Sequence, residues 1–146
     1  MGLNTTHGAW DGAYSAFTRW RHMLAEVAGY EIMPVIYDEG RVHGSRMGYG
    51  ADTLMLDWGH ITDANVRGDW DRLPEDPLLV LLVHSDCDGH IAPREAAALA
   101  ERLEELLPAL PDGTGGGHIG DWRAKTQTFI DGIRQAARAG ETVEFH

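Results

Sequence analysis

Hydrophobic residues recur at helical spacing in three stretches of the chain. In residues 14–28, apolar side chains fall at every third or fourth position, and Gly29 supplies a stop signal. The same spacing recurs in residues 93–107, which open with a proline at the first helical position. It recurs again in residues 121–140, where Asp121 can cap the amino terminus and a glycine ends the stretch. The pattern therefore predicts three amphipathic helices.

The other apolar stretches are shorter and predict strands. Residues 78–83 (LLVLLV) form a continuous apolar run after a proline, which predicts a strand buried on both faces. Strands are also predicted at residues 3–6, 53–57 and 142–145. Residues 40–50 hold four glycines in eleven positions and show no periodicity, so they predict a loop.

Strands and helices alternate along the chain, which favours an α/β fold. We expect one compact domain over residues 1–146, with a small mixed sheet packed against about three helices. The length of 146 residues fits one domain, and 43% hydrophobic and 24% charged residues are typical of folded chains.

Charge narrows the expected partners. The chain has 12 basic and 23 acidic residues, a net charge of −11, which repels phosphate backbones and anionic lipid surfaces. We therefore expect neither nucleic acid nor membrane as a partner, while a small molecule or a protein partner and the oligomeric state stay open. No apolar run reaches the ~18 residues of a membrane span. The amino terminus lacks the features of a secretory signal, and Cys87 has no second cysteine to pair with, so we expect a cytoplasmic protein.

Chemistry-bearing side chains are concentrated in residues 84–95, HSDCDGHIAPRE. This segment resembles the twelve-residue calcium loop of the EF-hand, which has oxygen ligands at positions 1, 3 and 5, Gly at 6, a backbone carbonyl at 7, an apolar residue at 8 and a bidentate Glu at 12. The matching residues at positions 3, 5, 6, 7, 8 and 12 are Asp86, Asp88, Gly89, His90, Ile91 and Glu95.

The resemblance implies a bound divalent cation, with the carboxylates of Asp86, Asp88 and Glu95 and the carbonyl of His90 as ligands. Two features depart from the EF-hand pattern. Position 1 is His84, a nitrogen donor that Ca²⁺ does not favour, and the segment entering the loop is predicted as a strand instead of a helix. The chain also has no second loop of this kind to pair with the first.

The first six of these residues, HSDCDG, also resemble the first motif of the DHH phosphoesterases, His-x-Asp-x-Asp-Gly after a buried strand. That resemblance implies catalytic Mn²⁺ bound by His84, Asp86 and Asp88, although the Asp-His-His triplet of that family does not occur in this chain. We favour Ca²⁺ over Mn²⁺ or Mg²⁺, and whether the chain is an enzyme stays open. A purely structural interpretation also accounts for the segment, because Asp-Gly is a common turn and Glu95 complements the helix dipole.

A second candidate site lies near the amino terminus. His7, Trp10, Tyr14 and Arg19 mix aromatic and polar groups around a helix start, a combination that could line a small-molecule pocket. On this interpretation the chain is a non-catalytic module that binds a small molecule or a partner protein. The aromatic residues fit equally well into the hydrophobic core.

Most of the chain resembles a set of small bacterial and phage proteins. The shared features are a Gly-Leu-Asn opening, a His-Gly-x-Trp-x-Gly-x-Tyr-Ser-x-Phe segment, the His-Ser-Asp-Cys-Asp-Gly segment, and a helix followed by a Phe-His tail. This resemblance implies a bacterial or phage origin and no particular activity.

Overall fold

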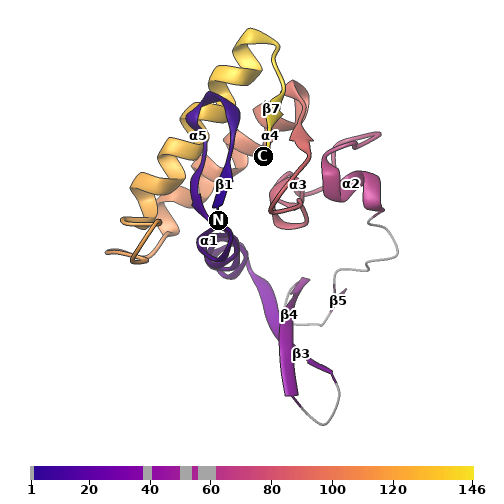
Figure 1. Cartoon of the computed structure of the whole chain (residues 1–146), viewed down its shortest axis with the longest axis vertical. Helices are drawn as coiled ribbons and strands as arrows, with labels where there is room; N and C mark the ends of the chain where they lie inside the picture. Colours follow the sequence, from indigo (N-terminus) through magenta and orange to yellow (C-terminus); the bar gives the residue numbers. More distant parts are fainter. Residues whose placement is uncertain (1, 38–40, 50–53, 56–61) are drawn as a thin grey trace.

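The computed structural model describes residues 2–37, 41–49, 54–55 and 62–146, with side chains described for 2–30 and 62–146. Figure 1 shows a mixed α/β domain with three substantial helices, as the sequence predicts. In chain order the elements are β1 (Gly2–Asn4), η1 (Thr6–Gly8), β2 (Asp11–Ala13), α1 (Tyr14–Val27), β3 (Tyr30–Tyr37), β4 (Arg41–Tyr49), β5 (Leu54–Met55), α2 (Asp63–Arg67), α3 (Leu79–Leu82), β6 (His90–Ile91), α4 (Pro93–Leu106), η3 (Leu107–Ala109), α5 (Trp122–Ala139) and β7 (Val143–Glu144).

The three long helices, α1, α4 and α5, lie where the hydrophobic periodicity predicts them. At the start of α5 the Asp121 carboxylate accepts a hydrogen bond from the amide of Ala124 at 2.8 Å. At its end Gly140 adopts a φ of 68°, a left-handed conformation that glycine tolerates. The helices α4 and α5 lie side by side, and α1 packs below them in the view of Figure 1.

Aromatic residues from helices α1 and α5 and from the segment before β2 form the centre of the core. Trp10, Phe17, Trp20 and Phe129 are each at most 1% exposed. The ring centroids of Trp10 lie 5.1 Å from Phe17 and 5.0 Å from Trp20, and Trp20 lies 4.9 Å from Phe129. The indole of Trp20 donates a hydrogen bond to the hydroxyl of Thr126 at 2.9 Å, so this buried polar group is satisfied.

The strands pair only antiparallel in the described chain, in the ladders β1–β2, β3–β4–β5 and β6–β7, and no single mixed sheet holds them together. A bridge between Thr5 and Phe145 links the first and last ladders, giving the order β2–β1–β7–β6. The amide of Asn4 donates to the carbonyl of His146 at 2.7 Å, and the amide of His146 donates to Asn4 at 2.9 Å. The two ends of the described chain therefore lie next to each other, as Figure 1 shows.

The predicted strand at residues 78–83 is wrong, because this run contains the short helix α3. It is buried as expected, with Leu78, Val80 and Leu81 at 0% exposure. Just before the helix, the carboxylate of Asp76 accepts a hydrogen bond from the amide of Leu78 at 2.9 Å. An apolar run without periodicity fits a buried helix as well as a buried strand.

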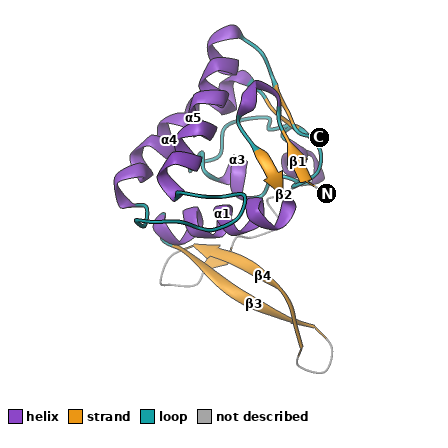
Figure 2. Ribbon diagram, turned by 60° about the vertical axis from the view of Figure 1, so that its left-hand side comes forward, coloured by secondary structure: helices purple, strands orange, loops and turns teal. Residues whose placement is uncertain are grey.

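The predicted loop at residues 40–50 is also wrong over residues 41–49, which form β4. This strand pairs with β3 from Tyr30↔Tyr49 to Tyr37↔Arg41, with one register shift. Glycine weakens a strand but leaves its backbone hydrogen bonds intact, so pairing with β3 overrides the local preference. In Figure 2 both strands extend away from the helices.

The remaining predicted strands are shorter in the structure. The prediction for residues 3–6 corresponds to β1, which ends at Asn4, and that for 142–145 corresponds to β7. Of residues 53–57, only β5 lies inside the described chain. No helix among the described residues has the length and apolar character needed to cross a membrane.

Candidate functional site

The segment predicted to carry the chemistry connects helix α3 to helix α4. Gly89 turns the chain with a φ of 96°, and residues His90–Ile91 then form β6, which pairs with β7. Helix α4 begins at Pro93, directly after the loop. Because α3 is a helix, the order here is helix, loop, helix. The entering strand that separated this segment from the EF-hand pattern is therefore not present.

The imidazole of His84 is buried at 2% exposure inside the loop. Its Nδ1 lies 2.8 Å from the carbonyl oxygen of Ser85, and its Nε2 lies 3.0 Å from that of His90. The ring stacks on Phe145 with centroids 4.1 Å apart. Burial lowers the pKa of His84, while the two backbone contacts act in the opposite direction. Both nitrogens face the backbone, so His84 is not oriented as a metal ligand.

The three predicted carboxylate ligands have different surroundings. Asp86 is half-buried and Asp88 is exposed, and neither side chain accepts a hydrogen bond from the described residues. Glu95, in the first turn of α4, is only 2% exposed. Its Oε1 accepts a hydrogen bond from Arg94 at 3.0 Å, whereas its Oε2 is buried and has no partner among the described residues.

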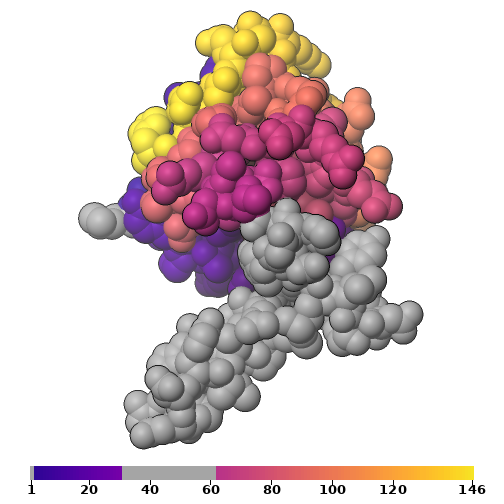
Figure 3. Space-filling model, turned by 90° about the vertical axis from the view of Figure 1, so that its right-hand side faces the viewer, coloured from indigo at the N-terminus to yellow at the C-terminus, as the bar shows by residue number. Residues whose placement is uncertain are grey.

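The end of α2 lies directly against the loop. The Nε2 of His90 is 2.8 Å from the carboxylate of Asp69, and the amide of Ser85 donates to the carbonyl of Val66 at 2.7 Å. A Cβ added to Gly68 would lie 1.6 Å from the carbonyl oxygen of His90, so only glycine fits this contact. In Figure 3 the segment that begins after residue 61, in magenta, lies at the surface of the face that is shown.

The loop does not hold its side chains as a metal-binding group. Across the described residues, no three or more His, Cys, Asp or Glu side chains are placed to share a metal ion. The predicted ligands Asp86, Asp88, His90 and Glu95 therefore belong to one loop, but the structure does not gather them around a common point. Cys87 is exposed at the tip of the loop, next to the hydroxyl of Ser85.

Sequence reasoning missed Arg21, which holds the start of the loop. Its Nη1 donates to the carbonyl of His84 at 2.6 Å and lies 3.4 Å from the carbonyls of Leu81 and Leu82. These carbonyls end helix α3, so Arg21 caps that helix. Burial lowers the pKa of Arg21 to about 10, and the charge of Asp86 acts against that shift. The sequence signal that could have identified Arg21 is its position on the core-facing side of the predicted first helix, where a charged residue is unusual.

The residues of the second candidate site lie in different surroundings. Trp10 is 1% exposed and belongs to the core, as the alternative interpretation of the sequence expects. His7 has a φ of 61° and lies 3.7 Å from the carboxylate of Glu141. Tyr14 is half-buried, and Arg19 is exposed.

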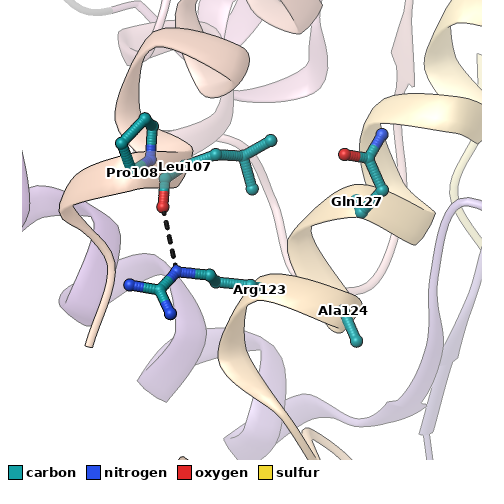
Figure 4. Close-up of a pocket in the computed structure, with 5 residues that line it drawn as sticks. All are labelled: Leu107, Pro108, Arg123, Ala124 and Gln127. Carbon is teal, nitrogen blue, oxygen red and sulfur yellow. Dashed lines mark hydrogen bonds between the residues drawn. The ribbon is translucent and has the colours of Figure 1, made fainter. Parts of the chain in front are cut away.

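Two open grooves lie along α5 instead. One, of about 460 Å³, lies between η3 and α5 (Figure 4) and is lined by Leu107, Pro108, Arg123, Ala124 and Gln127. The side chain of Arg123 extends from α5 to η3, where its Nε donates a hydrogen bond to the carbonyl of Leu107 at 3.3 Å. The other, of about 510 Å³, is lined by Asp131, Arg134, Gln135, Arg138 and Ala139. Neither groove contains a predicted site residue.

Comparison with known proteins assigns no class: no family model, no curated protein and no solved structure matches the chain. A functional conclusion therefore depends on the residues of the loop and their surroundings.

Proposed function

We propose that this chain binds a divalent cation at residues 84–95, with Ca²⁺ favoured over Mn²⁺ and Mg²⁺. The observation that carries the proposal is the second carboxylate oxygen of Glu95, which is buried and has no partner among the described residues. A buried polar atom without a partner costs about 1–3 kcal/mol, and more when it is charged. A bound water or ion can satisfy such an atom. Glu95 stands at position 12, where the EF-hand loop has its carboxylate ligand.

The backbone around Glu95 supports the same proposal. The loop runs between two helices, Gly89 at position 6 has a positive φ, and Ile91 at position 8 is fully buried in a short antiparallel ladder. In the calcium loop, glycine at position 6 allows the sharp turn that directs ligands to the ion. These are features of backbone shape, and they do not depend on the side chains that would contact the ion.

The loop side-chain atoms that remain available to bind an ion are carboxylate oxygens, which favours a hard cation. Both nitrogens of His84 face carbonyl groups, and the ring of His90 contacts Asp69. The groups left to contact an ion are the carboxylates of Asp86, Asp88 and Glu95, and oxygen ligands suit Ca²⁺ better than transition metals. Because these carboxylates do not converge on one point in the structure, we expect the loop to close around the ion as it binds.

The phosphoesterase alternative is less well supported than cation binding. It needs a nitrogen of His84 on the metal, and this ring would have to leave Phe145 and two carbonyl groups to supply one. We therefore do not extend the proposal to metal-dependent hydrolysis.

Thermal unfolding of chelator-treated protein tests the proposal, with Ca²⁺, Mn²⁺ or Mg²⁺ added over a range of concentrations. A ligand at about 100 times its Kd stabilises the folded state by roughly 2.7 kcal/mol. That corresponds to a rise in Tm of several degrees for a chain of this size, at about 2–4 °C per kcal/mol. We expect Ca²⁺ to give the largest rise.

Glu95→Gln should abolish the Ca²⁺-induced rise in Tm, because it removes the charge of the unpartnered oxygen. Glu101→Gln is the matched control, since Glu101 is an exposed carboxylate on the same helix, and it should keep the rise. If none of the three cations changes the Tm of the wild-type chain, the chain does not bind a divalent cation at this loop and the proposal fails.

A further inference from the structure

We infer that the carboxyl-terminal tail, residues 141–146, is coupled to the cation site, so that docking of the tail and binding of the ion strengthen each other. This inference rests on the proposed function. The tail contains β7 and contacts the loop directly.

The tail contacts the loop through Phe145 and through the pairing of β7 with β6. The amide of Phe145 donates to the carbonyl of Gly89 at 2.9 Å. The ring of Phe145 stacks on His84 at 4.1 Å, and Val143 is paired with Ile91 between β7 and β6. These contacts involve positions 1, 6 and 8 of the loop, which lie between and beside the predicted ligands. The tail therefore restricts the part of the backbone that an ion would have to fix.

The other side of the tail is attached to the amino-terminal segment. The amides of Asn4 and His146 each donate to the other residue's carbonyl, at 2.7 and 2.9 Å. The amide of Glu144 donates to the hydroxyl of Thr6 at 3.0 Å. Because β1 holds the tail in this way, the loop is tied through the tail to the rest of the domain. A change in the loop is therefore transmitted to the tail.

Coupling follows because both events order the same loop. An ion that fixes residues 84–95 removes conformational freedom that tail docking would otherwise have to remove, and the converse is equally true. Reciprocity requires that each event favours the other by the same factor. The contacts of Phe145 with Gly89 and His84 make this residue the expected point of transmission.

Two measurements test the coupling on the full chain. In the first, the amide of Phe145 in the wild-type chain should exchange with solvent about five-fold more slowly or better when Ca²⁺ is bound, since typical couplings are 5–150-fold. In the second, Phe145→Ala should weaken the apparent Ca²⁺ affinity by about the same factor. Glu144→Ala is the control, because Glu144 is exposed and is bound through its backbone, and its affinity should stay within about two-fold of wild type.

The outcomes separate the two proposals. If Ca²⁺ binds the wild-type chain but leaves the exchange of the Phe145 amide unchanged, the coupling is refuted and the proposed function stands. This measurement needs no variant, so it decides the question even where Phe145→Ala fails to fold. If a folded Phe145→Ala chain binds Ca²⁺ as tightly as wild type, the coupling is also refuted. If Ca²⁺ does not bind the wild-type chain, the proposed function and the coupling fail together.

Discussion

Replacing His84 by aspartate should destabilise the chain, although the EF-hand resemblance points in the opposite direction. A calcium loop has an oxygen ligand at position 1, so His84→Asp would be tolerated or favourable if that side chain faced an ion. In the structure the ring is 2% exposed, its nitrogens lie 2.8 and 3.0 Å from two carbonyl oxygens, and it stacks on Phe145. Aspartate has no N–H to donate, and its charge would be buried.

The size of the effect can be worked out from these contacts. Leaving a buried carbonyl without its donor costs about 1–3 kcal/mol, and losing the ring contact costs about 0.5–1.5 kcal/mol. Burying a carboxylate that lacks a matched partner adds more, although the charge of Arg21 offsets part of that cost. We therefore expect a loss of about 3 kcal/mol or more. For a chain of this length the Tm should fall by roughly 10 °C.

Thermal unfolding in the presence of chelator, followed by tryptophan fluorescence, measures this loss. His118→Asp is the control, because His118 is exposed, and its Tm should stay within a few degrees of wild type. His84→Phe keeps a ring against Phe145 but removes the donor, so its Tm should lie between those of wild type and His84→Asp. If His84→Asp has the same Tm as wild type, the buried imidazole does not stabilise the loop, and the structural role described for His84 is refuted.

Three further predictions concern the loop and the ends of α5. Gly68→Ala should lower the free energy of unfolding by about 3 kcal/mol or more, because Gly68 has a φ of 101° and the added Cβ would meet the carbonyl of His90. Gly140→Ala should lower it by only about 1–2 kcal/mol, because Gly140 has a φ of 68° and its Cβ would lie in open space. Urea unfolding of the two variants compares these losses. Burial lowers the pKa of His84 in the folded chain, so as the pH falls His84 is protonated in the unfolded chain before it is protonated in the folded chain. The free energy of unfolding should therefore fall as the pH drops below about 6.5. Urea titrations between about pH 5 and 8 measure that slope, and an equal slope in His84→Phe would contradict the assignment. Asp121→Ala should destabilise the chain by about 1 kcal/mol through loss of the helix cap, and an unchanged urea midpoint would rule the cap out as a contributor.

The long helices could be predicted from the sequence because their signals are local. The apolar spacing of α1, α4 and α5 and the caps of α5 lie within the segments that they define. The run at residues 78–83 carries no periodicity, so its state is decided by contacts elsewhere. Arg21, 60 and more positions away in the chain, binds the carbonyls at the end of α3 and so stabilises a helix there. The pairing of β4 with β3 is likewise set by a neighbouring strand, which the glycine content of β4 conceals.

The candidate site could be predicted by residue type but not by arrangement. The sequence identifies the loop, its glycine and its carboxylates, because these follow a known spacing. It does not reveal that the ring of His84 faces the backbone, that Glu95 is buried beside Arg94, or that His90 contacts Asp69. Each of these contacts depends on how α2, α4 and the tail pack, which is a property of the whole fold.

The pairing of β1 with the tail also determines when the domain can be completed during synthesis. Asn4 is translated long before its hydrogen-bonding partner His146, and Phe17 is translated long before Phe145, whose ring lies 6.1 Å from it in the folded chain. A nascent chain that lacks residues 143–146 leaves one side of β1 unpaired and part of the aromatic core exposed to water. Unpaired strand edges and exposed apolar surface promote aggregation and recognition by chaperones. Chains that end before residue 143 should therefore be cleared, so that only chains that contain residues 143–146 accumulate in the folded form.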